Sequence, residues 1–256
     1  MDKRININAD MGESFGAWTM GNDAALLQIV RSANIACGFH AGDPQHMSQT
    51  LTLAAAAGVS VGAHPSFADL QGFGRRPMKL SNKELAAIVA YQLGALQALA
   101  LANGTRVTHL KPHGAMSNLS CNDIEMATVI AQTVALVDKS LVLLAPACSC
   151  LAQAGQAAGL RVALEVFADR AYQDDGQLVP RSQPHAMVHG ASESTQHVLA
   201  MLEAGGIVTY TGQVLPTEIH SICVHGDNPH AIDSAMALRD ALVEKGYAVT
   251  PLDQLV

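Results

Sequence analysis

The stretch Ala33-Asn-Ile-Ala-Cys-Gly-Phe-His-Ala-Gly-Asp-Pro44 contains the signals of a strand, a turn and a helix, in that order. Residues 33–37 form a short apolar run of the kind found in buried strands. Asp43 before Pro44 is a helix N-cap followed by proline at the first helical position, and Gly58 is expected to end that helix. The stretch therefore predicts a strand-to-helix corner that carries His40 in its turn.

The same order repeats along the chain and predicts parallel βα units. The candidate strands are residues 4–8, 33–37, 59–63, 107–111, 141–144, 161–166 and 221–224. Ser81 and Glu84 form a capping box for another helix, and Asn228-Pro229 repeats the cap-plus-proline signal. The chain has 256 residues and no evident linker, so we expect one α/β barrel domain over residues 1–256.

Two long inserts, residues 65–80 and 167–220, interrupt this rhythm. The second contains a helical pattern near 194–204 and a possible extra strand at 207–210. Inserts at the strand-end face commonly form the walls or lids of an active site. We therefore expect both inserts to border a pocket.

The composition restricts the partners and the compartment. With 15 basic against 22 acidic residues, the chain is not expected to bind nucleic acid or an anionic membrane. We expect no apolar run of membrane-spanning length, and the N-terminus lacks the apolar region of a signal peptide, which favours the cytoplasm. The five cysteines lack Cys-x-x-Cys zinc spacing and are expected to be free and mostly buried.

Ionisable side chains follow nearly every candidate strand. Because parallel strands in a barrel end on one face, residues far apart in sequence should converge there on one pocket. The residues expected to point into it are Asp10, His40, His64, Lys111, His113, Glu165 and His225.

The carboxylates and histidines leave several roles open. Asp10 or Glu165 could act as a general base, or they could cap a helix and form a structural ion pair. Asp10, His40 and His64 suit a divalent metal with open coordination positions. The alternative is a metal-free site in which the histidines bind substrate or transfer protons.

Three cations have clear chemical uses. Arg75 and Arg76 follow Gly72-Phe73-Gly74 and suit the capture of a carboxylate or phosphate, although a solvated surface pair is the alternative. Lys111 is placed to stabilise an oxyanion or phosphate. No P-loop, Gly-x-Gly-x-x-Gly or Gly-x-Ser-x-Gly motif is present, which disfavours P-loop ATPases, dinucleotide oxidoreductases and serine hydrolases.

These clusters resemble those of a known family over nearly the whole chain. The motifs are Asn8-Ala-Asp-Met-Gly-Glu13, Ser32-Ala-Asn-Ile-Ala-Cys-Gly-Phe-His-Ala-Gly-Asp43, Gly72-Phe-Gly-Arg-Arg76, Lys111-Pro-His-Gly114, Glu165-Val-Phe-Ala-Asp-Arg170 and Val224-His-Gly-Asp-Asn-Pro229. In this order they are similar to the LamB/YcsF family, the A subunits of bacterial ATP-dependent 5-oxoprolinase. One departure is Met116-Ser117-Asn118, where the family often has Leu-Tyr-Asn.

The resemblance implies a distorted seven-stranded (β/α) barrel like that of the polysaccharide deacetylases and related glycoside hydrolases. It also implies cleavage of 5-oxo-L-proline to L-glutamate with ATP and Mg²⁺, together with partner subunits B and C. Which subunit binds ATP is left open.

This reaction would assign roles to the motif residues. The base for water would be Asp10 or Glu165, and the acid for the ring nitrogen would be a histidine. The catalytic candidates are Asp10, Glu13, His40, His64, Lys111, His113 and Glu165. The substrate-binding candidates are Asn8, Arg75, Arg76, Asp169, Arg170, His225 and Asp227.

Two other functions remain open at this point. A metal-dependent deacetylase or carbohydrate-active hydrolase would use Asp10, His40 and His64 around a metal. A non-catalytic scaffold protein is the third possibility, although a scaffold has no need of so many strand-end carboxylates and histidines.

Overall fold

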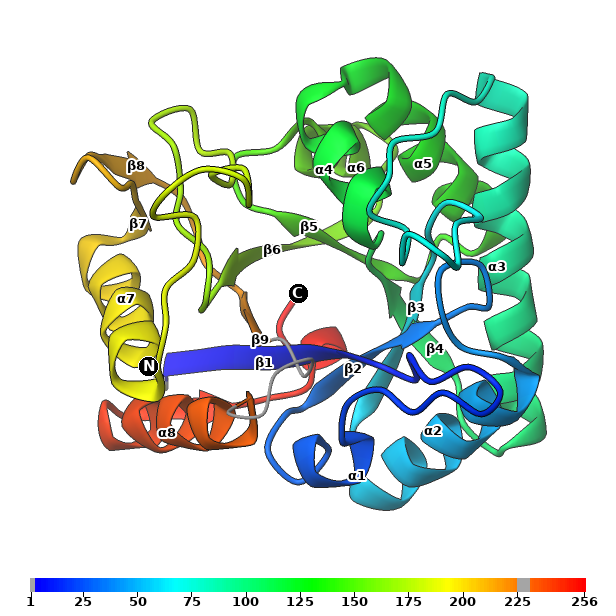
Figure 1. Ribbon diagram of the computed structural model, residues 1–256, viewed down its shortest axis with the longest axis horizontal. Coiled ribbons are helices and arrows are strands. Elements are labelled where there is room, and N and C mark those ends of the chain that lie inside the picture. The colour runs from blue at the N-terminus through cyan, green and yellow to red at the C-terminus, as the bar shows by residue number, and fades with distance from the viewer. Residues whose placement is uncertain (1–2, 225–230) are drawn as a thin grey trace.

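In the computed structural model, which describes residues 3–224 and 231–256, the apolar runs form one parallel sheet that closes into a barrel (Figure 1). The ring consists of β1 (Lys3–Met11), β2 (Ser32–Ala36), β3 (Ser60–His64), β4 (Val107–Leu110), β5 (Val142–Pro146), β6 (Arg161–Phe167) and β9 (Ser221–Val224). β9 pairs with both β6 and β1, which closes the ring. The predicted seven-stranded barrel is confirmed. Outside the ring, β10 (Tyr247–Val249) pairs with the start of β1.

Helices surround the ring of strands (Figure 1). They are α1 (Asp23–Leu26), α2 (Pro44–Ala57), α3 (Asn82–Ala102), α4 (Gly114–Asn122), α5 (Ile124–Val137), α6 (Cys150–Ala157), α7 (Ala191–Ala204) and α8 (Ala231–Glu244). The predicted caps of α2 are confirmed, since the Asp43 carboxylate accepts from two backbone N–H groups and Gly58 takes φ +65°. The capping box of α3 is also present. The predicted cap at Asn228-Pro229 lies outside the described residues.

The α3 helix corrects one expectation from the sequence. By length and composition alone, its 21 residues could cross a membrane. In the fold, however, its Leu85, Val89, Leu93 and Leu96 are buried in the same core cluster as the barrel strands. One face of α3 therefore packs against the barrel.

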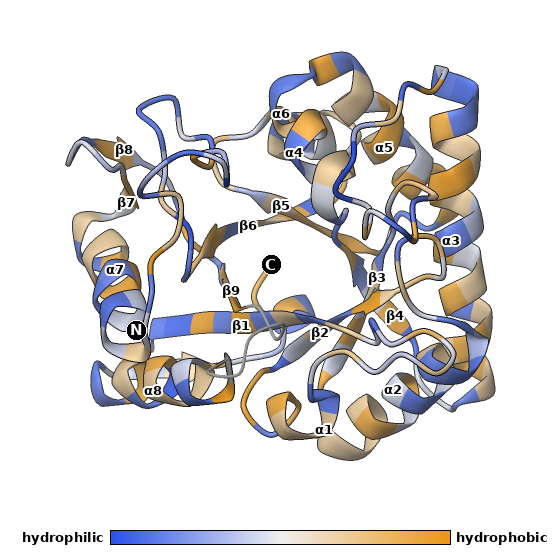
Figure 2. Ribbon diagram, viewed as in Figure 1, coloured by the Kyte–Doolittle hydropathy of each residue, from blue (hydrophilic) through white to orange (hydrophobic). Residues whose placement is uncertain are grey.

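Apolar and polar residues alternate along β1, as the alternating colours of the ribbon in Figure 2 show. Ile5 and Ile7 are buried in the hydrophobic cluster that the strands share with the helices. Asn6 and Asn8, one residue out of phase with them, bond to side chains of other barrel strands, including Ser221 of β9. Because successive side chains of a strand point to opposite faces, the helices receive the aliphatic set and the barrel interior receives the polar set.

A histidine occupies part of this polar interior. His109 on β4 is fully buried, its Nε2 lies 3.0 Å from Oδ1 of Asn34, and burial lowers its pKa to about 3, so that the ring is neutral. Its imidazole fills the space above Gly62 of β3: a Cβ on that glycine would lie 2.2 Å from the ring. His109 lies within the candidate strand at 107–111, which the structure shows as β4.

We expect Gly62→Ala to lower the free energy of unfolding by about 1–3 kcal/mol, the usual cost of overpacking a core. The added methyl group collides with a buried ring that has little room to move. The matched control is Gly94→Ala in α3, where a Cβ would meet no atom within 4 Å. That variant should be neutral or stabilised by up to about 1 kcal/mol, because alanine favours helix more than glycine does. Urea unfolding of the two variants checks this, and equal stabilities would contradict it.

The last residues of the chain close the amino end of the barrel. Leu252, in a short 3-10 helix (Leu252–Gln254), packs against Val142, Leu144 and Ala163. Its backbone N–H donates to the Ser32 hydroxyl at 3.2 Å. Figure 1 shows the C-terminus in the middle of the strand ring. The carboxyl end of the strands is therefore the end that is left for a site.

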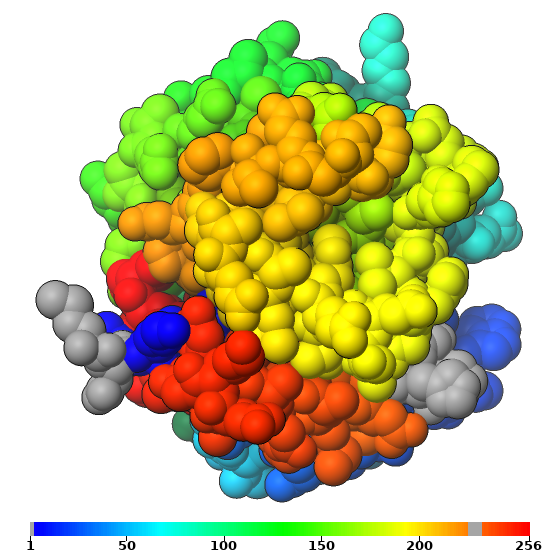
Figure 3. All heavy atoms as spheres, turned by 90° about the vertical axis from the view of Figure 1, so that its left-hand side faces the viewer, coloured from blue at the N-terminus to red at the C-terminus, as the bar shows by residue number. Residues whose placement is uncertain are grey.

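The insert at 167–220 carries α7 and an antiparallel hairpin of β7 (Gly206–Val208) and β8 (Val214–Pro216). Figure 3 shows it, in yellow to orange, covering one side of the molecule above α8. The helix predicted near 194–204 is confirmed but begins at Ala191, and the possible strand at 207–210 is found as β7.

Candidate functional site

A cavity of about 500 Å³ opens at the carboxyl ends of the strands. Both inserts contribute to its wall, through Phe73 and Arg75 of the first and Arg170, Tyr172 and Arg181 of the second. The predicted site residues that line it are Asp10, Glu13, His64, Arg75, Lys111, His113 and Arg170. Residues from different strands and loops thus meet at one end of the barrel, as the topology predicted.

Other predicted residues lie elsewhere. Asn8 and Glu165 are completely buried below the cavity and do not line it. His40 is buried behind the lining histidines and stacks on the ring of His113 at 3.9 Å. Asp169 does not line the cavity either. His225 and Asp227 lie outside the described residues.

The two adjacent arginines take different places. Arg75 lines the cavity, whereas the Arg76 side chain is 64% exposed and its guanidinium binds the Asp69 carboxylate. The prediction that both guanidinium groups serve the pocket is therefore corrected for Arg76. The two side chains diverge because the chain turns sharply at Gly74, where φ is +62°.

Asp10 and Lys111 form an ion pair at the floor of the cavity. Nζ of Lys111 lies 3.2 Å from Oδ1 of Asp10 and 3.2 Å from Oε2 of Glu165, and it also contacts Asn8 and the Cys223 thiol. Burial by itself would lower the pKa of Lys111, but the neighbouring carboxylates outweigh burial and raise it, so the ammonium is retained. Burial raises the pKa of Glu165.

Asn34 on β2 holds Asp10 in place and was missed in the sequence. Its side-chain amide donates to Oδ1 of Asp10 at 2.9 Å and to Oδ1 of Asn8 at 2.7 Å. The period-two pattern of Asn6, Asn8 and Asp10 on β1 was the available signal, because it marks the interior face on which a partner from β2 must lie. With Oδ1 of Asp10 held by Asn34 and Lys111, Oδ2 faces His64 at 3.2 Å.

Two histidines are oriented by backbone carbonyl groups. Nδ1–H of His64 donates to the Lys111 oxygen at 2.7 Å, and Nε2–H of His113 donates to the Phe73 oxygen at 2.9 Å. Phe73 has a φ of +53°, an unusual conformation for a residue with a side chain, and this aims its carbonyl at the ring. At Gly74 a Cβ would lie 2.8 Å from His40 and 2.3 Å from Ser66, so only glycine fits.

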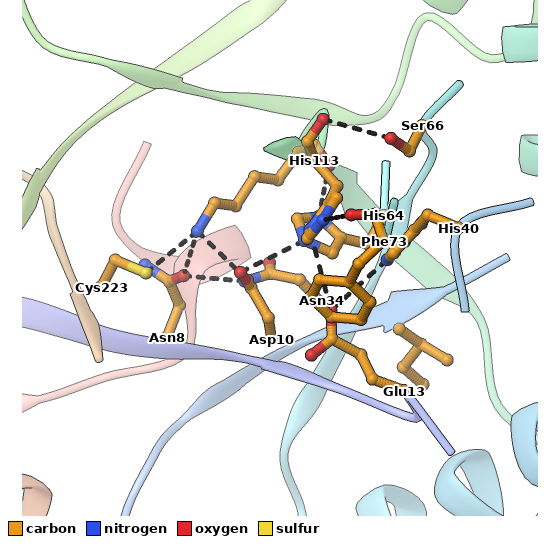
Figure 4. Close-up of polar contacts among 12 residues, drawn as sticks. Asn8, Asp10, Glu13, Asn34, His40, His64, Ser66, Phe73, His113 and Cys223 are labelled. Carbon is orange, nitrogen blue, oxygen red and sulfur yellow. Dashed lines mark hydrogen bonds and ion pairs between the residues drawn. The ribbon is translucent and has the colours of Figure 1, made fainter. Parts of the chain in front are cut away.

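The remaining ring nitrogens of these histidines meet each other and a carboxylate, as Figure 4 shows. Nε2 of His64 lies 3.0 Å from Nδ1 of His113. Oε1 of Glu13 lies 3.7 Å from Nδ1 of His113 and 3.3 Å from Nε2 of His40. Glu13, His40, His64 and His113 each place one potential metal-ligand atom within 4.8 Å of the others. This group differs from the predicted set of Asp10, His40 and His64.

Arg170 brings a charge to the wall of the cavity. Its guanidinium donates to the carbonyl oxygens of Val179 and Ala186, and within the described residues no carboxylate lies within ion-pair distance of it. Burial lowers the pKa of Arg170 to about 10, which still leaves it charged near neutral pH. An anionic ligand in the cavity would compensate this charge.

Several comparisons with known proteins bear on this site. The model of the LamB/YcsF family matches residues 5–256. The chain belongs to this family. The A subunit of 5-oxoprolinase from Azoarcus sp. (strain BH72) is 57% identical over 252 residues, which are 98% of each chain. The lactam utilization protein of Thermus thermophilus has a crystal structure with a TM-score of 0.90 and 42% identity, covering 96% of this chain and 99% of that one.

More distant structures share the LamB/YcsF barrel. T48 deacetylase, solved with its substrate, aligns at a TM-score of 0.52 and 15% identity, over 99% of this chain and 90% of that chain. This likeness confirms the predicted kinship with deacetylase barrels at the level of the fold. Ser117, which stands where the resemblance led us to expect a tyrosine, lines the cavity of this LamB/YcsF chain.

Proposed function

We propose that this chain cleaves 5-oxo-L-proline to L-glutamate as the A subunit of an ATP-dependent 5-oxoprolinase, together with subunits B and C. The names of close relatives support the substrate and the subunit organisation. The observation that carries the proposal is the Asp10 carboxylate, held by Lys111 and Asn34 at the floor of a cavity whose wall carries Arg75 and Arg170. A positioned base below an anion-binding wall suits a lactam that bears a carboxylate.

The chemistry of a lactam explains the need for ATP. An unstrained amide carbonyl is a poor electrophile, and transfer of the γ-phosphoryl group to the lactam oxygen makes the ring carbon reactive. Water attacks that carbon, the ring C–N bond breaks and the nitrogen takes a proton. The acyl phosphate left by ring opening is hydrolysed by a second water, which gives glutamate and phosphate.

The residues of the chain divide these tasks. Asp10, which lines the cavity, takes the proton from the attacking water, while Glu165 lies too deep to reach it. Lys111 stabilises the Asp10 carboxylate and the negative charge that develops beside it. Arg75 and Arg170 bind the substrate carboxylate. ATP with Mg²⁺ acts in the assembled complex.

The test is an assay of glutamate and phosphate release by this chain with and without its B and C partners. We expect coupled release of both products from the complex and little or none from the isolated chain. Failure of the complex to release glutamate from 5-oxoproline would contradict the function. Full ATP-coupled turnover by the homogeneous chain alone would contradict the dependence on partners.

A metal-dependent deacetylase is the second candidate, and the group of Glu13, His40, His64 and His113 favours it. The substrate distinguishes the two. Release of acetate from N-acetylated sugars without ATP, combined with inactivity towards 5-oxoproline in the complex, would select the deacetylase.

The adjacent arginines provide a matched test of the carboxylate clamp. We expect Arg75→Gln to raise the KM for 5-oxoproline about 10-fold or more, because a charge-assisted hydrogen bond is worth about 1.5–3 kcal/mol. Arg76→Gln should leave KM within about two-fold, since Arg76 lies outside the cavity. Steady-state kinetics of the complex measure both, and equal effects of the two substitutions would contradict the assignment.

A further inference from the structure

The hydrogen positions on His64 and His113 can be assigned from their partners. Nδ1 of His64 faces the backbone oxygen of Lys111, and Nε2 of His113 faces that of Phe73. A carbonyl oxygen only accepts hydrogen bonds, so each of these nitrogens must carry the hydrogen. In the neutral rings, Nε2 of His64 and Nδ1 of His113 therefore both carry lone pairs.

These two lone-pair nitrogens lie only 3.0 Å apart. Oδ2 of Asp10 adds a third acceptor, 3.2 Å from Nε2 of His64, and Oε1 of Glu13 adds a fourth, 3.7 Å from Nδ1 of His113. The two facing lone pairs of His64 and His113 repel one another unless a proton or a cation lies between them. A metal cation can meet both ring lone pairs and a carboxylate oxygen at once, whereas a single shared proton can bridge only two of these atoms.

The spacing of these atoms is close to that of a coordination sphere. Ligands bound tetrahedrally to one zinc-like ion at about 2.0–2.2 Å lie about 3.3–3.6 Å from each other. The pairs formed by His113 with His64 and with Glu13 are 3.0 Å and 3.7 Å apart. The edge-on arrangement of the His64 and His113 rings, at 86°, lets both ring planes contain the same ion.

His40 takes a different part in the cluster. Its ring is nearly parallel to that of His113, with an interplanar angle of 10°, so the two ring planes cannot both contain one ion. Nε2 of His40 instead lies 3.3 Å from Oε1 of Glu13, where its N–H can orient the carboxylate. Partners of this kind behind metal-binding residues fix the orientation of the ligands.

We propose that a divalent cation of the zinc class binds to Nε2 of His64, Nδ1 of His113 and the carboxylate of Glu13, with His40 positioning Glu13. All three ligand residues line the cavity, so a further coordination position of the ion would be accessible from the cavity. A cation there would polarise a carbonyl oxygen or lower the pKa of a bound water. Binding is measured without turnover, so this inference stands or falls separately from the 5-oxoproline assignment.

The experiment uses the full chain, treated with a chelator and then titrated with Zn²⁺ and with Co²⁺. We expect one ion per chain by elemental analysis after dialysis, and d–d absorption bands of Co²⁺ in a low-symmetry site. His64→Gln and His113→Gln should each weaken Co²⁺ binding by about 100-fold or more. His40→Gln should weaken it by about 10–100-fold, as expected for an outer partner.

The matched control is His46→Gln, because His46 pairs with Asp43 outside the cluster and should keep the full stoichiometry. Circular dichroism establishes that each variant is folded. If one of the two ligand variants fails to fold, the other ligand variant and the titration of the wild-type chain still test the proposal. No binding of either ion at micromolar concentration by the wild-type chain would overturn the proposal and leave a shared proton between His64 and His113. Unchanged binding by both folded ligand variants would overturn it as well.

Discussion

Asp10→Asn should reduce the turnover of 5-oxoproline by the assembled complex by about 10²-fold or more, the usual effect of losing a general base. The substitution keeps the shape of the side chain, and its carbonyl oxygen can still accept the bonds from Lys111 and Asn34. It removes the basic oxygen that faces the cavity. Glutamate release under substrate saturation measures the effect as a loss of kcat.

The matched control is Asp175→Asn, which makes the same change in a carboxylate that lines the same cavity but, among the described residues, bonds only to the backbone of Gln177. Its turnover should stay within a few-fold of the wild type. Circular dichroism of the Asp10→Asn chain shows whether a lower turnover comes from the missing base or from unfolding of the chain. Turnover by folded Asp10→Asn at a near-wild-type rate would remove Asp10 as the base.

Lys111→Met should lower the free energy of unfolding by about 3 kcal/mol or more, because removing one partner of a buried ion pair leaves an uncompensated charge. The Lys111 side chain is 4% exposed and is the cation between Asp10 and Glu165. Methionine keeps the length of the side chain without its charge. Urea unfolding of the isolated chain measures the difference.

The double variant Lys111→Met/Asp10→Asn separates charge from packing. It should recover part of the lost stability, because one of the two carboxylates that lose their cation is gone while Glu165 remains, but it should recover no turnover. A double variant as unstable as Lys111→Met alone would show that the cost lies in packing rather than in charge.

The sequence was sufficient to predict the barrel and much of the site. Strand ends are marked by glycine, proline and helix caps, and parallel topology then brings Asp10, His64, Lys111 and His113 together without further information. The sequence did not show how deeply each of these side chains lies below the cavity. Glu165 also follows an apolar run, but it lies one layer below the cavity, and this depends on the relative shift of neighbouring strands.

Side-chain direction was the second quantity that could not be read from the sequence. Arg75 and Arg76 are chemically identical, and only the left-handed turn at Phe73 and Gly74 decides which of them faces the cavity. The same turn supplies the carbonyl that orients His113, a contact between residues forty positions apart. Glu13 was predicted as catalytic. The loop after β1 places its carboxylate beside His113 and not beside Asp10, and the sequence did not show this.

The pairing of β1 with β9 has a consequence for biosynthesis. Asn8 of β1 lies in register with Cys223 of β9. The first strand of the ring can therefore complete its pairing only after one of the last strands has been synthesised. Contacts between such distant positions form slowly, because a long loop of chain must close first. During translation the amino-terminal strands would have an unpaired edge until residue 224 has left the ribosome, and such edges favour aggregation. We therefore expect yield in the cell to depend strongly on chaperones and growth temperature.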